Sequence, residues 1–262
     1  MIRHGFIAAL ALVLTLGTLM ADDRPGYTDG PKLPDSKWKV HDRNRPQPVR
    51  IAPGQGDLGV TAPSDALVLF DGNGLSAWER TDGKEMPGSC VENGTFDIMK
   101  TGTIRTKQEF GDCQLHIEWM TPPGPEDRMN WGNSGVFMMG LFEIQIIESH
   151  DSWIYADGNA GAIYGQYPAM VNPARKPGQW QSFDIVFTTP KFDGDRPVSP
   201  ARATVFYNGV LVQNNRNILG TTMHKVLPAP YPVKANGPVS LQDHHSAVKF
   251  RNIWIRPIRD PE

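Results

Sequence analysis

Short runs of alternating apolar and polar residues, separated by turn dipeptides, constrain the fold of this chain more than any other feature. In segment 113–120, CQLHIEWM, apolar and polar residues alternate from Cys113 to Trp119, so the apolar residues share one face of a strand and the polar residues the other. Asn93-Gly94 and Asn208-Gly209 are dipeptides typical of tight hairpin turns. From residue 67 onward we find neither a long helical stripe nor the spacing of βαβ units. These patterns predict an all-β sandwich or barrel of antiparallel strands.

The chain divides by composition into three predicted parts. Residues 1–21 have a basic start, an apolar run from Phe6 to Met20 and a small residue, Ala21, which is typical of a signal peptide. An uncleaved N-terminal anchor is the alternative. Residues 22–65 are rich in Pro, Gly and charge and predict an extended arm, and residues 66–262 form the β-domain. We therefore expect a secreted or periplasmic protein with no membrane segment beyond the export signal.

Net charge and cysteine content narrow the class further. The 262 residues carry a formal charge of -2, which argues against nucleic-acid binding because that requires a concentrated basic face. The two cysteines, Cys90 and Cys113, each begin a predicted strand, and an oxidising compartment predicts a disulfide between them. Two free buried thiols are the alternative, and the pair is a poor zinc signature.

A polar strand face is the first candidate site. In LFEIQIIES, residues 141–149, Glu143 and Gln145 point away from the core, as His116 and Glu118 do in their own strand. Trp131, Asn133 and Ser134 precede this strand, and His150 follows it. Acids and amides beside aromatic rings suit a carbohydrate, whose hydroxyl groups pair with polar side chains while its C–H faces rest on rings. The alternative is a plain solvent-exposed face.

The second candidate is the polar tip before the last strand. Gln242, Asp243, His244 and His245 lie together there, and two histidines beside an acid supply proton-transfer groups or metal ligands near neutral pH. A solvated hairpin turn is the alternative. The stretch from Ser149 to Pro177 has little alternation, and loops of that length within compact domains are often functional.

Four motifs in order resemble the 3-keto-disaccharide hydrolase domain family: LFDGNGLSAW at 69–78, CQLHIEWM at 113–120, GNSGVFMMGLFEIQIIES at 132–149 and LQDHHSAVKFRNIWIRPI at 241–258. The resemblance covers residues 67–258. It implies a concanavalin- or laminin-G-like jelly-roll sandwich, secreted by bacteria and involved in glycoside breakdown. The polar positions that match the family are Glu118, Asn133, Ser134, Glu143, Gln145, Glu148, Gln242, His244 and Arg251.

The resemblance implies a 3-keto-glycoside substrate, and the ketone makes the neighbouring C2–H acidic. One base, one acid and a group that stabilises the enolate oxygen are then required. Glu118, Glu143 and His244 are the candidates for proton transfer, and Arg251 or a divalent cation for the oxyanion. Cofactors and oligomeric state are not predicted. The remaining candidates would bind substrate: Trp131, Asn133, Ser134, Gln145, Glu148, His150, Gln242, Asp243 and His245.

Two other functions remain open at this point. A two-carboxylate glycosidase would place Glu118 and Glu143 on adjacent strands, at about 5–5.5 Å or about 6.5–9.5 Å from each other. A carbohydrate-binding module or lectin would use the same fold without catalysis, because fold alone does not decide function. Its flat aromatic rings would be Trp131, Trp153 and Tyr155 in the loops.

Overall fold

Two β-sheets packed face to face make up most of the described chain. The computed structural model describes residues 24–54, 56–88, 90–124, 129–150 and 154–259, so the predicted signal peptide lies outside the described residues. One sheet has eight strands, in the order β15 (Val210–Asn217), β14 (Arg202–Tyr207), β11 (Gln181–Thr188), β7 (Cys113–Met120), β17 (Lys249–Pro257), β5 (Thr95–Asp97) and β4 (Val91–Glu92), with β2 (Leu67–Phe70) also pairing with β17. The other has five, in the order β3 (Trp78–Arg80), β6 (Ile104–Thr106), β16 (Ser240–Leu241), β8 (Ser134–Met138) and β9 (Phe142–Ile146).

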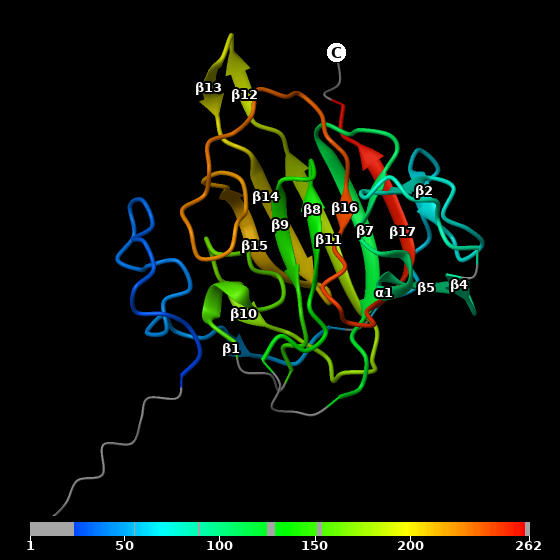
Figure 1. Ribbon diagram of the computed structural model, residues 1–262, viewed down its shortest axis with the longest axis horizontal. Coiled ribbons are helices and arrows are strands. Elements are labelled where there is room, and N and C mark those ends of the chain that lie inside the picture. The colour runs from blue at the N-terminus through cyan, green and yellow to red at the C-terminus, as the bar shows by residue number, and fades with distance from the viewer. Residues whose placement is uncertain (1–23, 55, 89, 125–128, 151–153, 260–262) are drawn as a thin grey trace, which may run out of the picture.

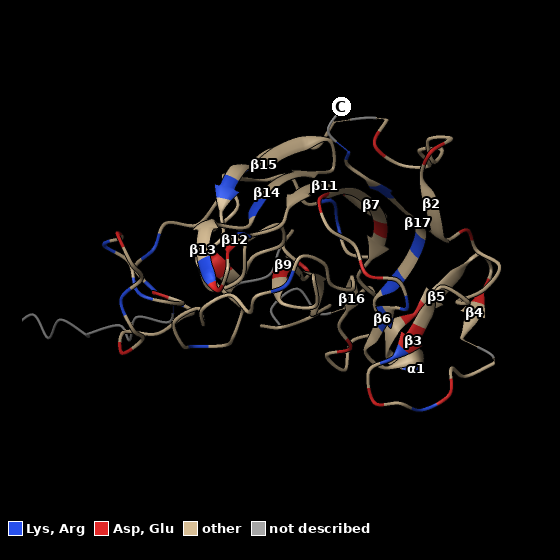
Figure 2. Cartoon of the chain, turned by 90° about the horizontal axis from the view of Figure 1, so that it is seen from above, with Lys and Arg blue, Asp and Glu red and all other residues tan. Residues whose placement is uncertain are grey.

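Neighbouring strands within both sheets run antiparallel, and the predicted alternation decides which residues enter the core. In the larger sheet Ile117 pairs with Phe183, and in the smaller sheet Val136 pairs with Ile144. All four side chains are fully buried between the layers. Figure 1 shows the five-stranded sheet in front of the larger one, and the view from above in Figure 2 shows the two layers separately. This is the predicted all-β jelly-roll sandwich.

The smaller elements lie at the edges of the sandwich. Strands β1 (Val49–Arg50) and β10 (Val171–Asn172) form a parallel pair, and β12 (Lys191–Asp193) and β13 (Arg196–Ser199) form a projecting hairpin. Helix α1 (Ile98–Thr101) begins after Asp97, whose side chain accepts a hydrogen bond from the Met99 N–H. A 3-10 turn, η1 (Ala156–Gly158), lies in the long loop between β9 and β10. No helix in this described part of the chain is long and apolar enough to span a membrane.

The N-terminal arm is ordered against the domain. Its first part folds back on itself through the Tyr27 N–H, which donates to the His41 carbonyl at 2.8 Å. Gly26 permits this close approach because its φ is +113° and a Cβ there would lie 2.7 Å from the same carbonyl. The arm then forms β1, crosses the outward face of the eight-stranded sheet at residues 57–60, and enters β2 on the opposite side of the molecule (Figure 1).

The predicted disulfide is wrong, because both cysteines are free and buried. Cys113 begins β7 and faces the core, where burial raises its thiol pKa to about 12. Cys90 precedes β4 and its Sγ donates to the Pro87 carbonyl at 3.0 Å. A disulfide would require the two cysteines to lie side by side, but strands β17 and β5 lie between β7 and β4 in the sheet.

Candidate functional site

A cavity of about 470 Å³ opens on the outward face of the five-stranded sheet. Its floor comes from β8, β9 and the residues that follow β16, and its walls come from the arm and from the loops after β9 and β15. We call it the central pocket. Its described lining is Tyr27, Met129, Asn130, Asn133, Phe137, Glu143, Gln145, Tyr155, Tyr164, Thr222, Met223, His224, Gln242 and His244.

Strand register places Glu143 and Gln145 on the floor of the central pocket. Glu143 pairs with Phe137, and Gln145 pairs with Gly135, so these positions share the face opposite the core. Gly135 leaves room for the acid, because a Cβ there would lie 2.5 Å from Glu143 Oε1. A larger residue at this position would displace the carboxyl group.

Glu143 is a buried carboxyl group without a Lys or Arg partner among the described residues. Only 5 % of the residue is exposed, and no Lys or Arg belongs to the described lining of the pocket. Burial raises the pKa of Glu143 to about 8, so the group is mostly protonated at neutral pH. The Gln145 amide, oriented with its nitrogen toward the acid, donates to Glu143 Oε1 at 2.8 Å. Glu143 can therefore donate a proton.

A chain of hydrogen bonds forms another wall of the pocket. The hydroxyl groups of Tyr155 and Tyr164 lie 2.6 Å apart, and the Tyr164 hydroxyl lies 2.8 Å from His224 Nδ1. His224 Nε2 lies 3.4 Å from the hydroxyl of Tyr27. Burial is the main reason that the pKa values of both inner tyrosines are raised, so they remain protonated.

The pKa of His224 is lowered, whereas that of Glu143 is raised. Burial lowers the pKa of His224, and the charges at His41, Lys225 and His244 lower it further. The imidazole is therefore mostly neutral at pH 7 and has a nitrogen lone pair. The central pocket thus combines a neutral acid with a neutral base.

The C-terminal tip contributes two of its four predicted residues. Gln242 and His244 line the pocket, and the Gln242 N–H donates to the Gly135 carbonyl at 3.1 Å. Asp243 and His245 do not line it. The Asp243 N–H donates to Thr103 Oγ1 at 3.0 Å, and the Asp243 carboxylate accepts from the His245 N–H at 2.9 Å.

Glu118 lies in a different place from Glu143. Strand β7 belongs to the eight-stranded sheet and β9 to the five-stranded sheet, so the expectation that the two acids lie on adjacent strands is wrong. The reason is that each sheet of a sandwich has its own outward face, with the same alternation along its strands. Glu118 is fully buried there beneath the arm, whose Gly59 N–H donates to its Oε1 at 2.6 Å.

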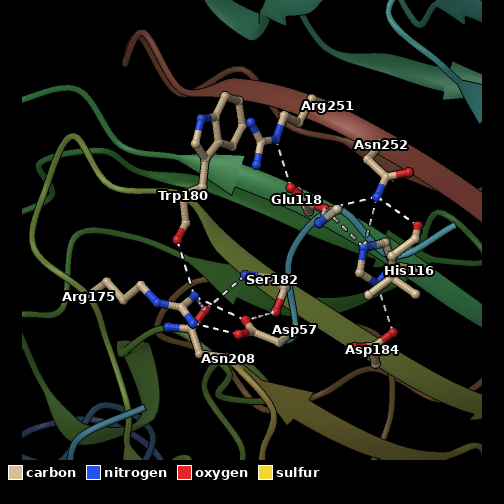
Figure 3. A network of polar contacts seen from close by, with 12 residues as sticks. Asp57, His116, Glu118, Arg175, Trp180, Ser182, Asp184, Asn208, Arg251 and Asn252 are labelled. Atoms are coloured by element: carbon tan, nitrogen blue, oxygen red, sulfur yellow. Dashed lines mark hydrogen bonds and ion pairs between the residues drawn. The ribbon is translucent and has the colours of Figure 1, made fainter. Parts of the chain in front are cut away.

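Around Glu118 the structure forms a network of polar contacts, shown in Figure 3. Arg251 Nε donates to Glu118 Oε2 at 2.7 Å, and Asn252 Nδ2 donates to Oε1 at 2.8 Å. His116 Nε2 lies 3.5 Å from the same carboxylate, and its Nδ1 lies 2.8 Å from Asp184. We call these residues the Glu118 network. Arg251 also stacks on Trp180, with its guanidinium carbon 4.1 Å from the ring centre.

Hydrogen bonds within the Glu118 network keep Glu118 and His116 charged. Burial opposes ionisation of Glu118, but hydrogen bonds from His116, Asn252, Arg251 and the Gly59 N–H together outweigh it and lower the pKa to about 2. Burial likewise opposes the charge on His116, while Asp184 and Glu118 together raise its pKa to about 9. Glu118 and Arg251 are therefore an ion pair outside the central pocket.

Of the other predicted residues, some line the central pocket and some lie outside it. Asn133 lines the pocket with Gln145 and Gln242. Ser134 instead shares the core face with Ile146 and donates through its Oγ to the Gln242 carbonyl at 2.7 Å. Three further predicted residues lie outside the pocket lining: Trp131, Glu148 and His150. Trp131 Nε1 donates to the Pro122 carbonyl at 2.9 Å. The backbone N–H of His150 donates to Glu148 Oε1 at 2.5 Å.

Three functional candidates were missed by the sequence interpretation: Tyr27, Tyr164 and His224. Tyr164 lies in the long stretch 149–177, which was noted for its length. Tyr155 of the same stretch, named only as a loop aromatic of a binding module, lines the pocket, and Trp153 lies outside the described residues. His224 lies in the long loop between β15 and β16, where the same length signal applies. No local pattern marks Tyr27, since only the folded arm brings it to the pocket.

The described residues include no group of three or more His, Cys, Asp or Glu side chains that is arranged to hold a metal ion. The described pocket residues therefore do not form a ligand set for the divalent cation that was considered for the oxyanion, and the proposed mechanism does not use one.

Comparison with known proteins agrees with this architecture. Residues 65–256 match the model of the 3-keto-alpha-glucoside-1,2-lyase-like domain. The chain belongs to this family. A crystal structure from Parabacteroides distasonis ATCC 8503, described as "a putative glycosyl hydrolase", is 41% identical, with a TM-score of 0.71 over 82% of this chain and 93% of that chain.

A second protein of the same description from that organism is 18% identical, with a TM-score of 0.55 over 74% of this chain and 94% of that chain. At that identity the likeness shows the fold alone. A search of curated proteins finds no match. Membership of the family and the 41% identical structure support a carbohydrate-active domain with a carbohydrate ligand.

Proposed function

We propose that this protein cleaves 3-keto-glycosides by elimination in the central pocket, with Glu143 as general acid and His224 as general base. The observation that supports this is that the pKa values of two groups in one pocket are shifted in opposite directions. The pKa of Glu143 is raised to about 8, whereas that of His224 is lowered, so both groups are neutral near pH 7. Such a pair is ready to donate one proton and accept another.

The reaction moves two protons. A neutral His224 nitrogen removes the proton from C2 of the sugar, and the C2–H electron pair forms an enolate with the C3 ketone. The C1–C2 double bond then forms while the C1–O bond breaks, and the leaving oxygen takes the proton of Glu143. Water can add to the unsaturated sugar afterwards, which gives net hydrolysis. The enolate oxygen requires hydrogen-bond donors, which the pocket has in its amides and tyrosine hydroxyls.

The pocket offers little support for a two-carboxylate glycosidase. Glu143 is the one carboxylate in the described lining, and Glu118 lies on the other sheet. An ordinary glycosidase requires a second acid across the scissile bond. Elimination needs a single acid, because the C3 ketone makes C–H cleavage accessible to an imidazole.

The decisive experiment offers the protein an aryl 3-keto-glucoside and the matching unoxidised aryl glucoside. We expect aryl release from the keto-sugar alone, with a primary isotope effect when C2 carries deuterium. Release from the unoxidised sugar without that isotope effect would overturn the elimination mechanism. Saturable binding with no release from either sugar would instead support the binding-module alternative.

We also propose export from the cytoplasm, to the periplasm or the medium. The support is the pattern of residues 1–21, where a basic start and an apolar run end at Ala21. Fractionation of cells that express the full chain tests this, with N-terminal sequencing of the exported form. A full-length protein confined to the cytoplasm would contradict it.

A further inference from the structure

The arm contributes more to the central pocket than a linker would. Tyr27 lines the pocket, and both Tyr27 and His41 lie outside the residues 65–256 that match the family. His41 is fully buried behind the pocket wall, with its ring centre 4.0 Å from that of Tyr155 and 5.0 Å from that of His224. The arm therefore touches the proposed base from two directions.

His41 is fixed by a buried carboxylate. Asp157 of η1 is fully buried, and its Oδ1 lies 3.2 Å from His41 Nδ1 while its Oδ2 accepts from the His41 N–H at 3.0 Å. Arg45 of the arm lies 3.5 Å from the same carboxylate. The other ring nitrogen of His41, Nε2, is buried with no hydrogen-bond partner among the described residues. A polar atom kept in this state costs stability, and such costs are typical of functional sites.

The arm also holds the loop that presents His224. Lys225 forms an ion pair with Asp29 at 3.1 Å, and its Nζ lies 4.1 Å from the centre of the Tyr27 ring. The Tyr27 hydroxyl lies 3.4 Å from His224 Nε2. In the tautomer in which His224 Nδ1–H donates to Tyr164, Nε2 has the lone pair and Tyr27 is its neighbour.

We propose that residues 24–47 are part of the active site, with the His41–Asp157 pair as a positioning unit that orients His224, and with Tyr27 as a substrate-contacting wall. This inference rests on the proposed function for its kinetic part. The titratable and charged groups that face His224 are Tyr27 and His41 from the arm, Tyr164 from the loop after β9, Lys225 beside it, and His244 from the C-terminal tip.

His41→Asn is the direct test. Asn suits the left-handed backbone of His41, where φ is +54°, and its amide can still donate to Asp157. Losing the imidazole removes one of the electrostatic interactions that lower the pKa of His224. In NMR titration of the full chain, the His224 pKa should rise toward its ordinary value, about 6.5. The acid limb of kcat/KM should move to higher pH by the same amount, so kcat/KM at pH 6.5 should fall by up to about twofold, because about half of the base is then protonated.

Tyr27→Phe is the second variant, because it removes one hydroxyl group from a partly exposed ring and leaves the fold intact. We expect KM for the keto-glucoside to rise about threefold to tenfold with kcat nearly unchanged, as the loss of one hydrogen bond to substrate predicts. Tyr231→Phe is the matched control, because Tyr231 is a partly buried tyrosine outside the pocket that donates to the Ile218 carbonyl. It should change neither kinetic constant.

The outcomes separate this inference from the proposed function. An unchanged His224 titration in folded His41→Asn overturns the positioning role, whether or not the keto-glucoside is a substrate. A shifted titration without any turnover retains the positioning role and rejects the proposed reaction. If His41→Asn does not fold, Tyr27→Phe decides, and kinetic constants equal to those of the Tyr231→Phe control overturn the arm's place in the site.

Discussion

Glu118 and Glu143 are both almost completely buried on strands of the same sandwich, yet the hydrogen-bond donors and charges around them differ. Glu118 accepts hydrogen bonds from a guanidinium group, an amide and a backbone N–H, and lies near an imidazole (Figure 3). Glu143 has an amide neighbour, and the described lining of its pocket includes no Lys or Arg. The pKa of the first is lowered to about 2, and that of the second is raised to about 8.

This difference shows that burial alone does not determine whether a carboxyl group stabilises the fold or takes part in catalysis. A buried carboxylate whose oxygens are all hydrogen-bonded is fixed and charged, and its removal leaves other charges uncompensated. A buried carboxyl group without such partners keeps its proton and lowers the stability of the fold at neutral pH. It is retained where that proton is used.

The largest expected effect is on activity. Glu143→Gln keeps the shape of the side chain but has no proton to donate, so turnover of a 3-keto-glucoside should fall about 10²–10⁴-fold. A steady-state assay at pH 7 measures this, with Glu118→Gln as the matched control on the other sheet. Turnover within about twofold of wild type would remove Glu143 from the mechanism.

The next effect is on stability and belongs to the other acid. Glu118→Gln leaves Arg251 and the fully buried His116 without their shared anion, so we expect the free energy of unfolding to fall by about 3 kcal/mol or more. Denaturant unfolding at pH 6 measures it, with Glu143→Gln beside it. Equal loss of stability in both variants would contradict the distinction between the two acids, as would a large loss of turnover in folded Glu118→Gln.

The sequence alone predicted much of this fold, but it could not separate the two acids. Period-two alternation correctly placed Glu143 and Gln145 together on an outward face, and the turn dipeptides marked the hairpins. The same alternation placed His116 and Glu118 outward as well, and nothing in one strand tells which sheet of a sandwich it joins. The assignment depends on pairings such as β7 with β11 and β17, which join residues more than sixty positions apart.

Long-range contacts also explain the residues that were missed. Tyr27 reaches the pocket only because the arm folds back on the domain, and His224 is a single histidine in a proline-rich loop. The disulfide was wrong for a similar reason, since β17 and β5 separate the strands that the cysteines precede or begin. Patterns along the chain determine which residues face outward, but they do not determine which outward faces are covered.

The third effect is a difference in pH dependence. The pKa of Glu143 is raised in the folded state, so its contribution to stability is fully present below about pH 4.5 and is lost as pH rises toward about 8. Gln does not titrate in this range, so the Glu143→Gln variant does not lose this contribution as the pH rises. The variant should therefore gain on wild type between pH 5 and 8, by an amount on the order of 3–4 kcal/mol.

Melting temperatures of both proteins across that range measure the gain. Parallel curves would mean that Glu143 titrates normally, which contradicts its role as a neutral acid. The contribution of Glu118 to stability has the opposite pH dependence, because the pKa of Glu118 is lowered in the folded state. Its contribution is present above about pH 4.5 and is lost as pH falls toward about 2.

The smallest effect tests how completely the Glu118 network depends on its neighbours. Asn252 lies at a bulge in β17 with φ +45°, which allows Arg251 and Asn252 to reach Glu118 together, and its amide also donates to the Val60 carbonyl of the arm at 3.0 Å. Asn252→Gly keeps the backbone conformation and removes only the amide, so we expect a loss of about 1–2 kcal/mol in unfolding free energy. Turnover should stay near that of wild type, because the central pocket lies on the other sheet. A loss as large as that of Glu118→Gln would mean that the bulge, rather than the carboxylate, holds the arm across this face.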